Sequence, residues 1–486
     1  MKVLFVYMNT GSRSSFPIGL ANLATYVKSA GHQVEVFDTT FYKQFLKEDR
    51  SAIREKIRIY KPVENPITKV YTDSDLIGDL FKKIESFQPD LIGFSILSAH
   101  FYFSVNISRK IKEKYPFIPI IFGGLHPSLC PEETLAEPSI DMICRGEGEY
   151  AVEELLEKMQ AGKHFTDVRN LWIKQDGKVY KNALRELVDL NKLPVLDWGF
   201  FSEQHIHNPL NGHMWRIGSV EFSRGCPYSC DYCSCTALRN MTAPQKYLRH
   251  KNTEKAIADL VTLKEKYNIE MFYFLDESFL SMNVETLKDF AQEYKKRVGI
   301  PFYGMTHPNS VTEEKVKIIE DMGCYLMTVG IECGNEEFRA KYLNRKVANS
   351  KIIEAFDIFH RSKVIVSAFA MLGLPFETRE LVFDTIELVH RCHPETYAVG
   401  IFKPFIGSKL RQMCIDHGFF DPKHDSYNYP VETSILNMPQ FPREEIEKLH
   451  KTFVLYTKVD KKDYPLIRQA ETDDVLFDKL IKEHCS

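Results

Sequence analysis

The first 150 residues alternate short apolar runs with amphipathic stretches. Lys2–Met8 (KVLFVYM) is a continuous apolar run, as in a buried strand, and apolar residues then recur at helical spacing over Gly19–Ala30. Gly31 ends that helix, at a position that favours a residue with positive φ. Further strands are predicted at Val34–Phe37, Asp90–Ile96, Ile118–Phe122 and Asp141–Cys144, and a helix at Phe103–Lys114. Strands that alternate with helices predict a parallel sheet, so residues 1–150 are expected to form a Rossmann-like, doubly wound domain.

The pattern changes between residues 151 and 215. Asn170–Lys181 (NLWIKQDGKVYK) places Asp176-Gly177 between two strand-like runs, which predicts a β-hairpin. Asp189–Asp197 mixes polar residues with a proline and is typical of a connecting segment. We therefore expect residues 151–215 to be a linker that contains one hairpin.

Strand–helix alternation resumes over residues 216–412, with helices predicted at Thr253–Tyr267 and Val284–Val298. The predicted strands are Val220–Ser223, Met271–Leu275, Phe302–Met305, Tyr325–Ile331, Val364–Met371 and Tyr397–Phe402. Six βα units in about 190 residues fit a partial (β/α)6 barrel of the TIM type better than an eight-unit barrel. Residues 413–486 are charged with amphipathic stretches, which predicts a C-terminal helical extension. The expected fold class is thus α/β, with a Rossmann-like domain before the partial barrel.

Composition excludes several classes of protein. The 486 residues are 44% hydrophobic, and 63 Lys+Arg against 66 Asp+Glu give a formal charge of −3, so we expect no nucleic-acid partner. The first residues, MKVLFVYMNT, lack the features of a signal peptide. The longest apolar runs, such as Leu91–Leu97, are far shorter than the ~18 residues of a membrane span. A cytoplasmic protein with no transmembrane segment is expected.

The window Ser223–Cys235 (SRGCPYSCDYCSC) contains four of the eleven cysteines, and three of them are spaced as C-x3-C-x2-C. Cys226, Cys230 and Cys233 would lie on one loop directly after a predicted strand. A structural zinc site would need a fourth protein ligand, and no second C-x-x-C pair lies nearby. Iron–sulfur clusters normally take four thiolates, so three leave one iron open to a substrate or cofactor. Buried or zinc-binding cysteines remain the alternative.

The spacing C-x3-C-x2-C, with Tyr232 before the last cysteine, resembles the radical S-adenosylmethionine (SAM) superfamily over about residues 216–410. The resemblance implies a 4Fe–4S cluster held by Cys226, Cys230 and Cys233. It also implies that the open iron is chelated by the amino and carboxylate groups of SAM. One-electron reduction in this family cleaves SAM to a 5′-deoxyadenosyl radical that abstracts hydrogen.

The same resemblance implies further SAM-binding residues. Asp276 and Glu277 end the second predicted barrel strand (FYFLDES) and would hold the methionyl amino group, with a helix N-cap cluster as the alternative. Glu332 in VGIECGN would face the ribose hydroxyls or the sulfonium. Tyr232 would pack near the adenine, although plain loop packing is the other interpretation. Ser367–Glu377 (SAFAMLGLPFE) resembles the segment that lines the adenine, and its apolar residues fit the barrel core equally well.

The first domain resembles the cobalamin-binding Rossmann domains of one radical SAM class, the methylases and cyclases. Ser95-Ile96-Leu97 follows one predicted strand and Gly123-Gly124 follows the next, at the sheet edge where ligands bind. Glycines there let a bulky ligand tail approach the backbone. His126 would touch the corrin or its tail, with local hydrogen bonding as the alternative. Two further segments share the resemblance: GGLHPSLCPEE (Gly123–Glu133) and DMICRGEGE (Asp141–Glu149).

One feature departs from that class. The cobalt-ligating motif D-x-H-x-x-G should follow the first strand, but residues 9–20 read NTGSRSSFPIGL and contain no histidine. Bound cobalamin would therefore lack a histidine ligand from that motif. A domain that has kept the fold and lost the cofactor is the alternative. His32 and His100 are the other nearby histidines, and His32 follows a helix-ending glycine as a turn residue would.

The leading hypothesis is a radical SAM enzyme that uses a 4Fe–4S cluster, SAM and cobalamin. It would methylate an unactivated carbon or phosphorus centre of a small-molecule substrate, with a reducing partner such as flavodoxin or ferredoxin. An oxidative cyclase or rearrangement enzyme without methyl transfer is one alternative, and a non-catalytic iron–sulfur or cobalamin sensor is another. The sequence assigns no catalytic acid or base. His307 and Tyr303 are candidate substrate contacts, with packing as the alternative role.

Overall fold

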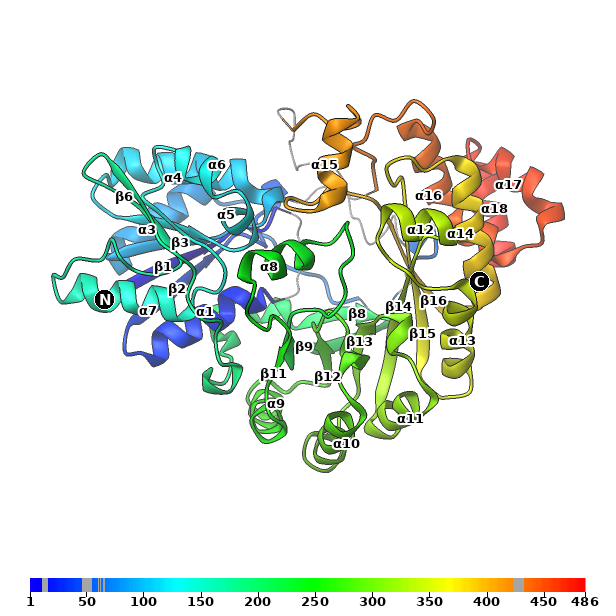
Figure 1. The fold of residues 1–486 in the computed structure, drawn as a ribbon, viewed down its shortest axis with the longest axis horizontal. Helices are drawn as coiled ribbons and strands as arrows, with labels where there is room; N and C mark the ends of the chain where they lie inside the picture. Colours follow the sequence, from blue (N-terminus) through cyan, green and yellow to red (C-terminus); the bar gives the residue numbers. More distant parts are fainter. Residues whose placement is uncertain are drawn as a thin grey trace.

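Two seven-stranded sheets, one in each half of the chain, organise the protein (Figure 1). This computed structural model describes residues 1–10, 16–45, 55–59, 61, 63, 66–422 and 432–485. Part of the segment that lacks the cobalt-ligating motif, residues 11–15, therefore lies outside the described residues. None of the described helices is long and apolar enough to cross a membrane.

The first sheet has the strand order β2-β1-β3-β4-β5-β6-β7. Its first five strands are parallel, and the last two join as an antiparallel hairpin. The strands are β1 (Lys2–Tyr7), β2 (Gln33–Asp38), β3 (Leu91–Ser95), β4 (Ile120–Gly123), β5 (Met142–Cys144), β6 (Leu171–Gln175) and β7 (Lys178–Lys181). The helices are α1 (Ile18–Ser29), α3 (Leu76–Phe87), α4 (Phe101–Lys114), α5 (Leu125–Leu129), α6 (Pro131–Ala136) and α7 (Glu149–Gln160).

The apolar run of β1 is explained by helices on both faces of this sheet. Val3 and Phe5 belong to a core cluster that includes residues of α1 and α7. Leu4 and Val6 belong to a second cluster, with residues of α3 and α4. Successive side chains of a strand point to opposite faces, so a strand buried on both faces contains no polar alternation. This arrangement is the doubly wound domain that the sequence predicts.

The hairpin forms where Asp176-Gly177 predicts it, and both turn residues have positive φ, 52° and 73°. It is not part of a free connection. Because β6 pairs with β5, the hairpin extends the first sheet, and Trp172 of β6 is buried against the sheet's core.

The second sheet has the order β16-β15-β14-β13-β12-β9-β8 and curls as a half-barrel. Six strands are parallel, and β8 joins the edge antiparallel. The strands are β8 (His207–Leu210), β9 (His213–Val220), β12 (Met271–Phe274), β13 (Phe302–Thr306), β14 (Cys324–Glu332), β15 (Ile365–Leu372) and β16 (Thr396–Ile401). The helices along it are α8 (Ser234–Thr242), α9 (Thr253–Tyr267), α10 (Val284–Glu293), α11 (Glu313–Met322), α12 (Glu336–Tyr342), α13 (Asn349–His360) and α14 (Arg379–Cys392).

The predicted position of the first barrel strand was wrong. That strand is β9, which ends at Val220, whereas Val220–Ser223 was predicted. The first half of β9 is partly exposed and contains polar residues such as Arg216, so it lacks the apolar run of the other strands. Ser223–Arg224 instead forms β10, which pairs antiparallel with β11 (Arg249–His250).

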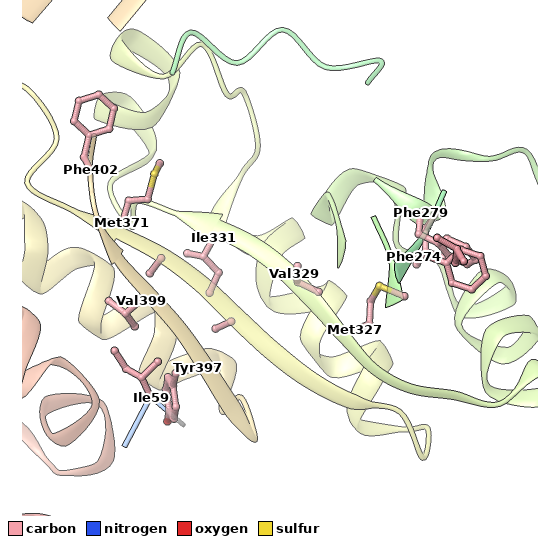
Figure 2. Packing of buried hydrophobic residues seen from close by; sticks show 14 of the residues in the cluster. Ile59, Phe274, Phe279, Met327, Val329, Ile331, Met371, Tyr397, Val399 and Phe402 are labelled. Atoms are coloured by element: carbon pink, nitrogen blue, oxygen red, sulfur yellow. The ribbon is translucent and has the colours of Figure 1, made fainter. Parts of the chain in front are cut away.

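Alternate residues of the barrel strands form the largest core cluster (Figure 2). Met327, Val329 and Ile331 of β14 are buried, while Thr328 and Gly330 between them are half-buried. This period of two places one face of β14 against its covering helices and leaves the other toward the barrel interior. The C-terminal helices pack beyond this sheet, with α16 against α14 and β16 (Figure 1). They are α16 (Arg443–Lys458), α17 (Tyr464–Ala470) and α18 (Asp474–His484), whereas α15 (Lys409–Asp416) lies between the two halves of the molecule, where the Leu410 N–H donates to the Asp231 carbonyl at 3.0 Å (Figure 1).

Candidate functional site

Cys226, Cys230 and Cys233 lie on one loop between β10 and α8, which we call the cysteine loop (residues 225–233). Cys230 is buried and the other two are half-buried, and all three are free thiols. Burial raises the pKa of Cys226 to about 11. Because metals bind thiolates, a metal centre must displace the proton of this thiol when it binds.

The loop is held by contacts to distant parts of the barrel. The Tyr228 ring stacks on His307, with ring centroids 3.7 Å apart, and its hydroxyl lies 2.7 Å from the Ser310 hydroxyl. The Asp231 N–H donates to the Leu343 carbonyl at 3.0 Å. These contacts fix the loop from both ends, so the spacing of the three sulfurs is set by the fold as well as by the sequence.

A buried Glu332–Arg345 pair lies beside Cys230. The Arg345 Nη1 is 3.8 Å from the Cys230 sulfur, and its Nη2 donates to the Gly330 carbonyl at 2.6 Å and lies 3.9 Å from the Glu332 Oε1. Burial raises the pKa of Glu332, while Arg345 and Tyr232 lower it in part. The Oε2 of Glu332 is buried with no hydrogen-bond partner in the described structure.

Backbone conformation aims Glu332 into this position. Its φ is 67°, and the strand register shifts between Gly330 and Glu332, as at a β-bulge. A Cβ at Gly330 would lie 2.5 Å from the Glu332 carboxylate and 2.9 Å from Arg345, so only glycine leaves room for both. Strain of this kind clusters at functional sites, and here it leaves an acceptor oxygen free to receive a ligand.

Asp276 and Glu277 lie on the other side of the cysteine loop. Asp276 is buried and accepts hydrogen bonds from the backbone N–H groups of Phe222 and Ser223 and from the Ser223 hydroxyl. Burial raises its pKa to about 7 against these hydrogen bonds. Glu277 is half-buried, and the Cys235 thiol is 3.5 Å from its Oε1. Asp276 thus holds Phe222 and Ser223, the residues that lead into the cysteine loop, and a role for either carboxylate toward SAM stays a prediction.

A cavity of about 230 Å³ lies at the carboxyl edge of the first sheet. Ser95, Gly123 and Gly124 line it, as do Glu221 and Arg224, which follow β9 of the second sheet. The remaining lining residues are Phe5, Gly19, Leu20, Leu23, Gly93, Phe94, Ile121, Cys144, Gly146, Glu147, Gly148, Glu149 and Val152. The side chains around the cavity are largely apolar, with a polar group of carboxylates and one guanidinium.

Two predicted cobalamin contacts lie outside this lining. Leu97 is 52% exposed just beyond the sheet edge. His126 is buried, its ring stacks on Phe101 at 4.0 Å, and its Nδ1 lies 3.2 Å from the Ser98 hydroxyl. Burial lowers the pKa of His126 to about 4, so the ring is neutral at neutral pH. Its Nε2 has no partner in the described structure.

Comparison with known families matches both halves of the chain. Residues 67–156 match the B12 binding domain, and residues 220–389 match the radical SAM superfamily. The chain is a radical SAM protein with a B12-binding domain. An uncharacterized methyltransferase of Pyrococcus horikoshii is 24% identical to this chain, and the alignment covers 95% of this chain and 94% of the relative's length. The cytidylyl-2-hydroxyethylphosphonate methyltransferase of Streptomyces wedmorensis is 22% identical, over 91% and 86%.

Other relatives of this radical SAM protein are named anaerobic magnesium-protoporphyrin IX monomethyl ester cyclases. Among solved structures, the cobalamin-dependent radical enzyme OxsB with aqua-cobalamin bound aligns with a TM-score of 0.67 at 16% identity, over 99% of this chain and 72% of its own. This likeness confirms the predicted fold class. The radical SAM domain and the relatives named as methyltransferases also identify the chain as an enzyme. This finding argues against a non-catalytic sensor.

The two domains of this radical SAM protein identify a 4Fe–4S cluster, SAM and cobalamin as its cofactors. The donor set fits the cluster. No three Cys, His, Asp or Glu side chains among the described residues converge as ligands of a single metal ion. Zinc would need four donors about 2.0–2.3 Å from one point. A cluster instead takes each thiolate on a different iron, which suits three sulfurs spread along a loop.

The cavity fits the tail of a bulky ligand of the B12-binding domain, since about 230 Å³ is less than even a drug-sized molecule needs. A Cβ at Gly93 would lie 2.7 Å from the Phe5 ring, and one at Gly124, where φ is 98°, would lie 2.9 Å from the Ile96 backbone. Both positions therefore need glycine for the backbone to close around the space. Ser95, Gly123 and Gly124 are the residues of the predicted motif that would contact cobalamin there.

Sequence reasoning missed Arg345, which lies thirteen residues beyond Glu332 and belongs to no recognisable motif. It also missed the contribution of Arg224 to the cavity, although that residue stands two positions before Cys226. His307 and Tyr303, considered as substrate contacts, stack on Tyr228 and on Tyr273, the latter pair at 4.3 Å. These stacks match the packing alternative that the sequence left open.

Glu377, at the end of the predicted adenine-lining segment, makes the stability of the fold depend on pH. It is fully buried, its Oε2 accepts from the N–H groups of Gly373 and Leu374, and its Oε1 has no partner in the described structure. Burial raises its pKa to about 8, with those hydrogen bonds lowering it in part. Between about pH 4.5 and 8 the folded state keeps a proton that the unfolded state has lost, so the free energy of unfolding falls as pH rises.

Glu377→Gln should remove this dependence. Each pKa unit corresponds to about 1.4 kcal/mol. Between about pH 5 and pH 8.5, the free energy of unfolding of the wild type should therefore fall by roughly 2–4 kcal/mol more than that of the variant. Chemical denaturation at several pH values measures the difference. Exposed Glu444→Gln is the matched control and should follow the wild type. Parallel pH profiles of Glu377→Gln and wild type would contradict the buried, protonated state.

Proposed function

We propose that this protein transfers a methyl group from SAM to an unactivated carbon or phosphorus atom of a small-molecule substrate. The observation that carries the proposal is that the cavity of the B12-binding domain lies next to the cysteine loop. Arg224, two residues before the first cysteine, lines the same cavity as Gly123 and Gly124 of the B12-binding domain. A chain that only needed SAM cleavage would have no reason to place a cobalamin cavity against the cysteine loop. The two relatives named as methyltransferases give further support.

When bound, the cluster and SAM supply a carbon-centred radical, and cobalamin supplies a carrier for the methyl group. The work of this chain is to hold those groups and to exclude water. Cys226, Cys230 and Cys233 would ligate three irons. The unpartnered Oε2 of Glu332 would accept a hydrogen bond from a hydroxyl-bearing ligand, and the Arg345 guanidinium beside it would pair with a ligand carboxylate.

Burial strengthens both interactions. Glu332 and Arg345 have only 8% and 5% of their side chains exposed, so charges in this part of the site are weakly screened by water. Thr328 and Gly330 on the inner face of β14 are half-buried, and Glu332 and Arg345 occupy the space beside Gly330. The protein thereby orients its ligands while the reacting centres stay dry.

The cyclase alternative retains the same cofactors and differs in the product. We expect methyl transfer, because the relatives aligned over 95% and 91% of this chain, and over 94% and 86% of their own chains, are named methyltransferases. A test that needs no substrate uses SAM with a trideuterated methyl group. Anaerobic protein loaded with reduced cobalamin should transfer the label to the bound corrinoid within minutes, as measured by mass spectrometry of the extracted cofactor. Protein that binds both cofactors and leaves the corrinoid unlabelled would favour the cyclase alternative.

Two expectations from the sequence stay predictions. One is the reductant, a flavodoxin or ferredoxin, since radical SAM enzymes need a one-electron donor. The other is a cytoplasmic location. Reduction of the reconstituted protein by purified flavodoxin and fractionation of the source cells would test them separately.

A further inference from the structure

Four consecutive residues, Ser223 to Cys226, link the carboxylates Asp276 and Glu277 to the cavity of the B12-binding domain. The Ser223 N–H donates to the Asp276 carboxylate at 2.7 Å. The backbone of Gly225 hydrogen-bonds to Glu277 and lowers the pKa that burial raises. Cys226 is a predicted cluster ligand. Ser223 and Gly225 therefore face the SAM side of the protein.

Arg224 faces the opposite way, as the alternation of a strand requires. Its guanidinium lies 3.2 Å from Glu147, 2.9 Å from Glu149 and 2.9 Å from Glu221. All four side chains line the cavity of the B12-binding domain, and each is at most 17% exposed. Asn22 of the first domain adds a hydrogen bond to Glu221 at 2.8 Å. The cavity thus ends on a buried ionic network centred on a residue of the other domain.

This four-residue segment is closely packed and cannot move in parts. Gly225 has a φ of 100°, and a Cβ there would lie 2.6 Å from the Tyr247 carbonyl oxygen. Arg224 pairs with Arg249 across the β10–β11 ribbon, and Arg249 itself donates to Glu147 at 2.6 Å. A shift of the Arg224 side chain must therefore displace its neighbours on the SAM side.

We propose that Arg224 is a positioning residue that couples occupancy of the cobalamin cavity to the conformation of the cysteine loop. A ligand in the cavity immobilises Glu147 and Glu149, which orders Arg224 and through it the loop. A cluster on the loop orders the same network from the other side. Each ligand then binds to a protein already partly ordered by the other, and such coupling is reciprocal. This inference rests on the proposed function, because it needs both cofactors.

The test compares hydroxocobalamin affinity of the full-length protein with and without its cluster. Couplings of this kind typically change affinity by about 5- to 150-fold, and we expect the cluster to tighten hydroxocobalamin binding about tenfold in the wild type. In Arg224→Met that ratio should fall to about one. Arg224→Lys should restore part of it, since the ammonium keeps the charge but cannot reach three carboxylates.

Two further variants separate coupling from general damage. Glu149→Gln alters the network from the cavity side and leaves the cysteine loop intact. It should therefore also reduce the affinity ratio, and it keeps the test valid if Arg224→Met folds poorly. Arg379→Met is the matched control, because its guanidinium is 15% exposed like that of Arg224 and pairs with the buried Glu471 far from the cavity. It should keep the wild-type ratio.

These measurements separate a failure of the proposed coupling through Arg224 from a failure of the proposed methyl transfer. A wild-type protein that binds hydroxocobalamin equally well with and without its cluster overturns the coupling and leaves the proposed function standing. The coupling is also overturned if Arg224→Met and Glu149→Gln both keep the wild-type ratio of hydroxocobalamin affinities with and without the cluster. A protein that binds no hydroxocobalamin in either state overturns both.

Discussion

Cys233→Ala should lower the iron content of the anaerobically reconstituted protein from about four atoms per chain to well under half of that and abolish 5′-deoxyadenosine formation. The reason is that the cysteine loop supplies three thiolates and has no spare ligand position. Without the Cys233 thiolate, two of the four irons have no protein ligand. Iron and sulfide assays, with chromatography of the nucleoside products after reduction, measure the effect.

Cys235→Ala is the matched control for this prediction. Cys235 stands two residues further on and also lies close to the site, but its thiol contacts Glu277 at 3.5 Å and falls outside the C-x3-C-x2-C spacing. It should retain the wild-type iron content. Iron lost equally from both variants would show that Cys235 belongs to the ligand set, and iron kept in Cys233→Ala would contradict the assigned cluster.

Gly123→Val should weaken hydroxocobalamin binding by about 10- to 100-fold while leaving the fold intact. Gly123 lines the cavity, and the nearest atom to a Cβ built there is 3.7 Å away, so the new side chain enters the cavity without striking the protein. Valine also suits a strand position such as this end of β4. An occupant forced against the added methyl groups loses about 1–3 kcal/mol, by analogy with overpacked cores.

A graded series checks this second prediction. Gly123→Ala adds a single methyl group and should weaken binding less than valine does, with circular dichroism and thermal melting unchanged in both. Equal hydroxocobalamin affinity in wild type, Ala and Val variants would place the corrinoid elsewhere on the protein. Cluster content, measured in parallel, should stay at the wild-type value in the valine variant.

Much of the fold follows from local pattern. Strands β1 and β4 of the first sheet are continuous apolar runs because helices cover both faces, and the Asp176-Gly177 turn signals its hairpin directly. The cysteine motif is equally local, since all three ligands lie within eight residues. Such features are readable because the physics that produces them acts over a few neighbouring positions.

Other features depend on tertiary contacts that no local pattern encodes. The first barrel strand, β9, is polar over its exposed half, so its start could not be recognised from apolar periodicity. The pairing of β6 with β5 depends on an unpaired sheet edge that only the folded domain presents. Arg345 and Arg224 become site residues through partners that lie far away in sequence, such as Cys230 at a separation of 115 residues and Glu147 at 77.

The open iron of a three-cysteine cluster is the central claim, and electron paramagnetic resonance of the reduced, anaerobic protein tests it most directly. We predict a signal from one reduced 4Fe–4S cluster per chain whose g values shift when SAM is added, because SAM binds the iron that lacks a cysteine. A signal that SAM leaves unchanged, or zinc in place of iron on these cysteines, would contradict it.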